Sequence, residues 1–210
     1  MLAPSMMPPG PARPTRRSWR EARYAALDFE TTGLDFRHDA VVSIGVIPVL
    51  GGRIVMREAI HQLVAPAVAP SPRSQTIHEL RPQDLMDAPS LDEARPILAE
   101  AIEGRHLLVW FADVEVHFLA EIFGGSLRSW RRRTIDVRNL AIAAEGQPRE
   151  RRRRPGFPLT GTAEQYGVPV AEPHQAFDDA LVTAQLFLVL TSHLTRREPT
   201  VRDVVRVGKP

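Results

Sequence analysis

The feature that most constrains the fold is an apolar run that ends in two carboxylates, at residues 24–30 (YAALDFE). In an extended strand, residues i and i+2 point to the same face, so Asp28 and Glu30 would converge while Leu27 and Phe29 are buried on the other side. Two adjacent carboxylates repel each other unless a positive charge lies between them. A hard divalent cation such as Mg²⁺ or Mn²⁺ prefers such oxygen ligands. Taken alone, D-x-E favours a simpler alternative, a strand end with two solvated acids before a Thr-Thr-Gly turn.

A second pattern, far along the chain, favours the metal site over the solvated strand end. Residues 174–179 (HQAFDD) open a long apolar stretch that is typical of a helix. On this helix His174 would lie at the entrance and Asp179 about one turn in, with Ala176 leaving room between them. The two patterns D-x-E-T-T-G-L and H-x-A-x-x-D, in this order, are much more specific than either part.

These motifs resemble those of the DEDDh 3′→5′ exonucleases, of the type found in the proofreading (epsilon) subunit of bacterial DNA polymerase III. The resemblance covers roughly residues 22–195. A lesser element of the family, I-H-G-I, corresponds to residues 77–80 (IHEL), with Glu79 where the family has glycine. The first and third motifs of the family are matched by Asp28, Glu30, Thr31, Thr32, Gly33 and Leu34, and by His174, Ala176 and Asp179.

The second motif is where this chain departs from the family. The family usually reads H-N-A-x-F-D-x-x-F-L, and the aligned residues 110–119 read WFADVEVHFL. Anchoring on Ala112 places Glu115 where the family has Asp, and the longer side chain moves the carboxylate by about 1.5 Å. A misplacement of about 1 Å at a catalytic site can cost about 10²-fold in rate. The resemblance implies a partly water-mediated metal contact, which would accommodate Glu115; Asp113 is the alternative ligand.

Two aromatic segments have a structural and a functional interpretation. Trp110 and Phe111 replace the His-Asn pair of the family; we expect Phe111 in the core, and Trp110 either there or stacked on an unpaired base. Residues 185–188 (QLFL) suggest a sliding-clamp-binding peptide, but their place within an apolar helical pattern favours core packing.

Phosphodiester hydrolysis needs an activated water, stabilisation of the phosphate charge and help for the departing 3′-oxyanion. Two Mg²⁺ or Mn²⁺ ions about 3.5–4 Å apart can supply the last two and lower the pKa of the water. The resemblance implies that Asp28 bridges both ions, that Glu30 and Asp179 hold the ion carrying the nucleophile, and that Glu115 is the fourth carboxylate. His174 is the expected general base, because an imidazole has an ordinary pKa of about 6.5. The alternative for it is a surface residue at a helix start.

The resemblance also implies contacts with the terminal nucleotide. The expected substrate-binding residues are Thr31, Thr32, Gly33, Leu34 and His78. The implied function is a 3′→5′ exonuclease that releases nucleoside 5′-monophosphates from single-stranded 3′ ends, DNA rather than RNA, with proofreading or DNA repair as its setting. The alternative is a catalytically weakened homologue that binds 3′ ends or acts as a partner subunit. A polymerase tether is disfavoured, because only about fifteen residues follow the last expected helix.

Composition is consistent with one cytoplasmic enzyme domain. The 210 residues suffice for a full core, and the absence of cysteine excludes disulfides and thiolate zinc sites. The apolar runs are too short for a membrane span, and the N-terminus lacks the pattern of a signal peptide. We expect a disordered Pro/Arg-rich lead over residues 1–20, an exonuclease domain over 21–195 and a short tail over 196–210.

Basic residues are bunched although the formal net charge is only +2. The dense runs are residues 131–133 and 151–154, all arginine. A nuclease could use such runs to bind phosphates in a salt-dependent way. Coding bias is the alternative, since all basic residues except Lys209 are arginine.

The expected order of elements favours a mixed sheet. Strands are predicted at 23–29, 40–50, 53–64, 106–111 and 134–137, with Gly51-Gly52 as a hairpin turn. Helices are predicted at 91–102, with Ser90 as N-cap, and at 114–123, 137–144, 161–166 and 178–194. A hairpin followed by β-α alternation suits an α/β fold, and the resemblance implies a ribonuclease H-like five-stranded mixed sheet flanked by helices.

Overall fold

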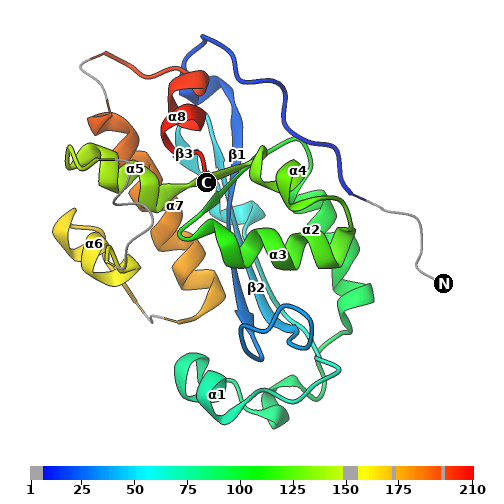
Figure 1. The fold of residues 1–210 in the computed structure, drawn as a ribbon. Coiled ribbons are helices and arrows are strands. Elements are labelled where there is room, and N and C mark those ends of the chain that lie inside the picture. The colour runs from blue at the N-terminus through cyan, green and yellow to red at the C-terminus, as the bar shows by residue number, and fades with distance from the viewer. Residues whose placement is uncertain (1–6, 149–155, 172–173, 195–196) are drawn as a thin grey trace.

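A mixed β-sheet forms the centre of the protein (Figure 1). The computed structural model describes residues 7–148, 156–171, 174–194 and 197–210. The sheet order is β3-β2-β1-β5-β6, with β4 also paired to β2. Strands β2, β3 and β4 run antiparallel to their partners, and β5 and β6 run parallel to β1. The strands are β1 (Arg23–Thr31), β2 (Val41–Leu50), β3 (Arg53–Ile54), β4 (Ile60–Leu63), β5 (His106–Val109) and β6 (Thr134–Asp136).

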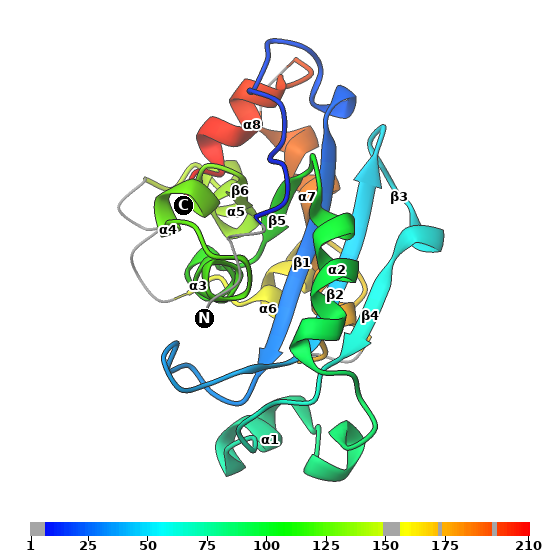
Figure 2. The ribbon, with the colours of Figure 1, turned by 90° about the vertical axis from the view of Figure 1, so that its right-hand side faces the viewer.

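Helices cover both faces of the sheet, with α5, α6 and α7 on one side and α2, α3 and α4 on the other (Figure 1). Figure 2 shows α2 lying along the sheet and α1 beyond the end of β1. Within the described residues, no helix is both long and apolar enough to cross a membrane. The helices are α1 (Pro72–His78), α2 (Leu91–Ile102), α3 (Ala112–Phe123), α4 (Leu127–Arg131), α5 (Val137–Ala144), α6 (Leu159–Gln165), α7 (Ala176–His193) and α8 (Val201–Val207).

The ribonuclease H-like fold class is confirmed, with six strands rather than five. The expected third strand is interrupted by a short 3-10 turn, Met56–Glu58, so that β3 and β4 are separate strands. Both pair with β2, which is long enough at ten residues to serve two partners along one edge.

Two apolar cores lie on the two faces of the sheet, and β1 contributes to both. Leu27 and Phe29 belong to the core under α2 and α3. Tyr24 and Ala26 belong to the core under α5 and α7. Because strand residues alternate between faces, Asp28 lies on the α7 side, in line with Ala26.

The described segments near the two ends of the chain, residues 7–22 and 197–210, pack against the rest of the fold, which differs from the expected disordered lead and short tail. The buried guanidinium of Arg133 donates to the carbonyl oxygens of Pro8 (2.7 Å) and Pro9 (3.1 Å). Trp19 is buried in the core, and Ser18 pairs with Thr200 in an isolated β-bridge. A Pro-rich segment has few backbone donors, but its carbonyl groups are free to satisfy a buried arginine. Residues 1–6 lie outside the described part.

The C-terminal segment is anchored in the same way. Helix α8 begins with a capping box between Thr200 and Asp203, and Val201 and Val204 are buried. The backbone N–H of Asp136 donates to the carbonyl oxygen of Gly208 at 2.7 Å. The segment expected to be a tail therefore continues the packing beside β6.

Candidate active site

Three carboxylates meet where β1 passes the start of α7. Asp28 and Glu30 lie two apart on β1, on the same face, and Asp179 lies in the first turn of α7. Oxygen atoms of these three residues all lie within 4.8 Å of one another. Two oxygens on opposite sides of a Mg²⁺ ion are about 4.2 Å apart, so the group has the dimensions of a site for a divalent cation.

A glycine on β2 lets α7 begin so close to β1. Gly45 pairs directly with Asp28 across the two strands. A Cβ atom on Gly45 would lie 2.6 Å from the backbone nitrogen of Phe177 and still closer to the carbonyl oxygen of Ala176. No other residue type fits at this position without moving α7, so Gly45 positions Asp179 opposite Asp28. No local pattern in the sequence predicts this role of Gly45, because it depends on a contact between segments far apart in the chain.

The acids are held together against their mutual repulsion. Burial, followed by the charges of Glu115, Glu30 and Asp179, raises the pKa of Asp28 well above its usual range. Burial and the charge of Asp179 raise the pKa of Glu30 to about 8. Burial also raises the pKa of Asp179, against the opposing effect of His174. Such a cluster is stabilised either by protons or by cations.

Glu115, rather than Asp113, faces this cluster from α3. Glu115 is buried, whereas Asp113 is exposed and paired with Arg131 at 2.7 Å. Burial raises the pKa of Glu115 to about 8, with smaller contributions from Asp136, Asp113 and Glu30. Glu115 lies outside the group of three carboxylates, yet its charge is the largest of those that raise the pKa of Asp28. The charge of Glu115 thus acts on the site from α3, a helix on the opposite face of the sheet.

The donor set fits divalent cations. One oxygen of Glu115 is buried without a hydrogen-bond partner within the described structure. An unpartnered buried carboxylate oxygen is costly and calls for an ion or a water. Hard oxygen donors from four acids, with neither cysteine nor a histidine in the metal-sized group, are typical of Mg²⁺ or Mn²⁺ sites.

His174 lies just before α7 and not inside a helix. Its backbone is in the left-handed region, with φ of 65°, and its side chain is exposed. The backbone N–H of His174 donates to a carboxylate oxygen of Asp179 at 3.3 Å, which ties the loop to the site. His174 is therefore beside the carboxylates but separate from the metal-sized group.

The Thr-Thr-Gly turn after β1 is held by the protein itself. The hydroxyl of Thr31 donates to the carbonyl oxygen of Gly33 at 2.8 Å. Thr32 is fully buried; its hydroxyl donates to Asp39 at 2.8 Å and accepts from the backbone of Ala40 at 2.9 Å. The side chain of Thr32 is therefore a structural element of the loop, and its expected part in substrate binding stays a prediction. Asp39, which the sequence analysis missed, also lies against Gly33 so closely that a Cβ there would clash.

The other two expected substrate residues differ in exposure. His78 is buried at the end of α1, where its Nδ1 accepts from the backbone N–H of Leu80 at 3.0 Å, and burial lowers its pKa. Its position beside the loop favours a supporting role. Leu34 is 68% exposed, which makes it the apolar residue of this loop that is open to a ligand.

The two aromatic residues before α3 differ in exposure, and only Phe111 departs from its expected place. Trp110 is buried, and its indole N–H donates to the carbonyl oxygen of Phe157 at 3.1 Å. Phe111 is 41% exposed, with the guanidinium of Arg138 over its ring. The expectation of a core position for Phe111 was wrong, because β5 ends at Val109 and the strand alternation does not extend to Phe111. Residues 151–154 lie outside the described part of the chain.

Comparison with known proteins identifies the group to which this arrangement belongs. Residues 25–187 match the model of an exonuclease family, RNase_T. The PolC-type DNA polymerase III of Thermotoga petrophila is 31% identical over 175 residues, which cover 81% of this chain and 12% of that protein. The 3′-5′ exonuclease DinG of Staphylococcus aureus is 23% identical over 168 residues, which cover 80% of this chain and 18% of that protein. The chain thus spans less than a fifth of the length of these curated relatives.

Solved structures share the fold. Exonuclease X in complex with 5′ overhanging duplex DNA superposes with a TM-score of 0.64 at 22% identity, covering 88% of this chain and 99% of that one. Exonuclease I of E. coli in complex with a dT13 oligonucleotide gives a TM-score of 0.68 at 16% identity. The superposition covers 82% of this chain and 41% of that one. At these identities the likeness is one of fold.

Proposed function

The chain belongs to the RNase_T exonuclease family, and from that membership we propose that it is a metal-dependent 3′→5′ exonuclease. Its proposed substrate is single-stranded nucleic acid, DNA in preference to RNA, and its products are nucleoside 5′-monophosphates. The preference for DNA is supported by the relatives, a DNA polymerase and a 3′-5′ exonuclease, and by neighbours bound to DNA. The observation that carries the proposal is the group of three carboxylates within 4.8 Å.

The four acids would hold two ions. Asp28, Glu30 and Asp179 would form one site, and Asp28 and Glu115 would contribute to the second, which is consistent with the charge interaction between these two residues. When bound, Mg²⁺ or Mn²⁺ would stabilise the charge on the phosphate and the departing 3′-oxygen and lower the pKa of the attacking water.

His174 is the proposed general base. It would take the proton of the attacking water, since an exposed imidazole next to the carboxylates can accept a proton and pass it to solvent. Its backbone contact with Asp179 supports this role, because the contact fixes the loop relative to the metal ligands.

The loop after β1 would hold the terminal nucleotide. Leu34 offers an exposed apolar side chain, and the hydrogen bond from Thr31 to Gly33 holds the turn that directly follows Glu30. The buried side chains of Thr32 and His78 would stabilise this loop from its interior side. For Thr32 the support is direct, since its carbonyl oxygen accepts from Ser71 (3.2 Å) and Ser74 (2.9 Å) in the segment of α1.

A second candidate function rests on Glu115. If the longer side chain misplaces the second ion, the protein would bind 3′ ends or a partner without efficient hydrolysis. The burial of Glu115 favours the active enzyme, because a carboxylate kept in the interior without a partner is costly unless it has a ligand.

The test is a time course on 5′-labelled single-stranded DNA and RNA with Mg²⁺ or Mn²⁺, comparing wild type with Asp28→Asn. This isosteric change removes one charge from the crowded site, so the variant should lose the 3′-shortening ladder while the metal-free protein melts at a higher temperature than wild type. Asp87→Asn removes the charge of an exposed acid elsewhere and should leave the ladder unchanged. If folded wild-type protein produces no ladder with either metal, the proposed exonuclease activity is refuted. The alternative, a protein that binds 3′ ends or a partner without hydrolysis, would then remain.

A further inference from the structure

A basic groove lies between α4 and α8, away from the carboxylates. It is a hollow of about 1060 Å³. Among the described residues that line it, seven are basic and none is acidic. The basic residues are Lys209 and six arginines: Arg13, Arg128, Arg131, Arg132, Arg202 and Arg206.

Most of these charges are not neutralised by the protein. Arg131 pairs with Asp113 at 2.7 Å and Arg206 with Asp203 at 3.4 Å. Within the described structure, the other basic side chains of the groove form no ion pair. Like charges within a Debye length of about 8 Å repel, and together they create a positive potential that attracts a polyanion.

Arginines continue beyond the groove, but acids accompany them there. A neighbouring hollow shares Arg202 and Arg206 with the groove and adds Arg16 and Arg197, together with Glu198 and Asp203. The excess of positive charge is therefore concentrated in the groove itself, where seven basic residues line a hollow of about 1060 Å³, more than a single small anion needs, and suit a ligand with charge along its length. We propose that this surface binds the sugar–phosphate backbone of the nucleic-acid strand whose 3′ end occupies the active site; the inference rests on the proposed exonuclease function.

The groove is built on a fixed scaffold. Its N-terminal wall is tied to α8 by hydrogen bonds from the backbone N–H groups of Val201 and Arg202 to the carbonyl oxygens of Arg17 (3.1 Å) and Thr15 (3.0 Å). Its other wall, α4, is anchored by the fully buried Trp130, whose indole N–H donates to Gly124 at 2.9 Å. Arginines held on such a scaffold lose less entropy on binding than those of a flexible tail.

The groove is connected to the active site through α3. Arg131 binds Asp113, which lies two residues before Glu115 in the first turns of that helix. Figure 1 shows α4 above α3 and the C-terminus between α4 and α8. A strand that leaves the carboxylates past the start of α3 would therefore enter the groove at Arg131.

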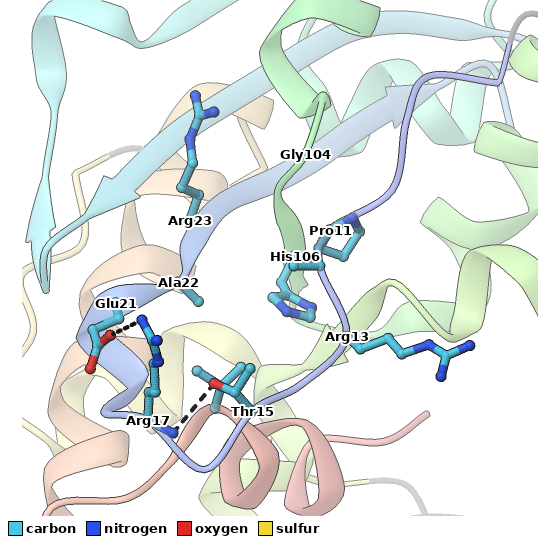
Figure 3. Close-up of a pocket in the computed structure, with 11 residues that line it drawn as sticks. Pro11, Arg13, Thr15, Arg17, Glu21, Ala22, Arg23, Gly104 and His106 are labelled. Carbon is cyan, nitrogen blue, oxygen red and sulfur yellow. Dashed lines mark hydrogen bonds and ion pairs between the residues drawn. The ribbon is translucent and has the colours of Figure 1, made fainter.

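The lining favours phosphates over bases. Among its described lining residues none is aromatic and able to stack on a base, and arginine is well suited to phosphate oxygens. The neighbouring hollow in Figure 3 is a poorer candidate: Arg17 is held by Glu21 at 3.3 Å, His106 is buried, and Arg13 points away from both. Binding in the groove should therefore depend on length and salt but little on base sequence.

Much of the groove lies outside the part of the chain that matches the exonuclease family. That match ends at residue 187, whereas Arg202, Arg206 and Lys209 follow it and Arg13 precedes its start at residue 25. The groove is thus built jointly by α4, which lies within the match, and by flanking segments that lie outside it and pack beside β6.

The test compares the double variant Arg128→Ala/Arg202→Ala with the matched control Arg53→Ala/Arg57→Ala. The control removes the same charge from exposed residues at and next to β3, at the opposite edge of the sheet. Fluorescence anisotropy with a long single-stranded DNA, without turnover in EDTA, should give a Kd that is raised about 2- to 30-fold in the groove variant, as expected for two surface ion pairs. The slope of log Kd against log salt should fall by about 1.4, at about 0.7 per lost phosphate contact.

Two further readouts show whether the lost positive charges cause the weaker binding. The charge-preserving Arg128→Lys/Arg202→Lys variant should bind nearly as wild type does. The kcat on a trinucleotide, too short to leave the active site, should be equal in all variants. A groove variant with the Kd and salt slope of the control would overturn the proposal and leave an acidic protein segment as the ligand. Failure of the proposed function would be visible separately, as a missing ladder in wild type.

Discussion

Gly45→Ala tests whether the contact between β2 and α7 positions the carboxylates that we propose to be catalytic. The added Cβ would lie 2.6 Å from the backbone nitrogen of Phe177, where ordinary contact begins at 3.4 Å. Relief of this overlap requires α7 and β2 to separate by about 1 Å, because neither backbone has a flexible end that could turn aside. Asp179 lies in the first turn of α7 and would move with it, away from Asp28.

The expected loss follows from this displacement. A misplacement of about 1 Å at a catalytic site can cost about 10²-fold in rate, which corresponds to about 2.7 kcal/mol of transition-state stabilisation. Overpacking costs about 1–3 kcal/mol of stability, which a domain of this size should tolerate. We therefore expect kcat/KM to fall by about 10²-fold, with a weaker apparent affinity for Mg²⁺.

The assay is the 3′-shortening time course, with thermal melting as the control for folding. Gly10→Ala is the matched glycine variant, because its Cβ would make only ordinary contact with Arg133, at 3.5 Å. Ile102→Val, in the core on the other face of the sheet, controls for destabilisation of about 0.5–1.5 kcal/mol. A folded Gly45→Ala protein with wild-type rate and metal affinity would refute the positioning role.

Three further changes probe the site and its surroundings. Glu115→Asp withdraws a buried carboxylate by about 1.5 Å and should lower kcat about tenfold or more; a higher rate would instead indicate a weakened homologue. Glu79→Gly replaces a residue at φ of 59° and should stabilise the fold by about 0.5–1 kcal/mol in urea melts without changing the rate. Because the pKa values of Glu30 and Glu115 are raised to about 8, the folded metal-free state binds more protons than the unfolded one, and its Tm in EDTA should fall as pH rises from about 4.5 to 8. Mg²⁺ should restore the Tm at pH 8 and have little effect at pH 5; a Tm in EDTA that does not fall over this range would contradict the raised pKa values.

Local signals in the sequence predicted the elements that depend on local interactions. Helix α2 begins and ends at the expected residues, because Ser90 and Glu93 form a capping box that can be recognised from four residues. The shared face of Asp28 and Glu30 follows from strand alternation alone. The core position of residues 185–188 follows from helical periodicity, and Leu186 and Phe187 are fully buried.

The elements that were missed depend on tertiary contacts. Helix α8 has only seven residues, too few for a clear periodicity, and it is stabilised by burial of Val201 and Val204. The lead around Pro8 and Pro9 is ordered by a buried arginine that lies far along the chain. The interruption between β3 and β4 and the close approach at Gly45 are equally invisible to a local pattern.

The crowded acids explain why the scaffold around them is so constrained. Within the described structure no basic side chain lies in the metal-sized group, and burial and repulsion both favour protonation of Asp28. Repulsion of this kind would separate β1 from α7 if either could move. The pairing of Asp28 with Gly45, the N–H of His174 on Asp179 and the apolar cores on both faces of the sheet oppose that movement. In the proposed metal site the ligand positions would therefore be prepared before any cation arrives, and the free energy lost to repulsion in the metal-free fold would become a preference for divalent ions.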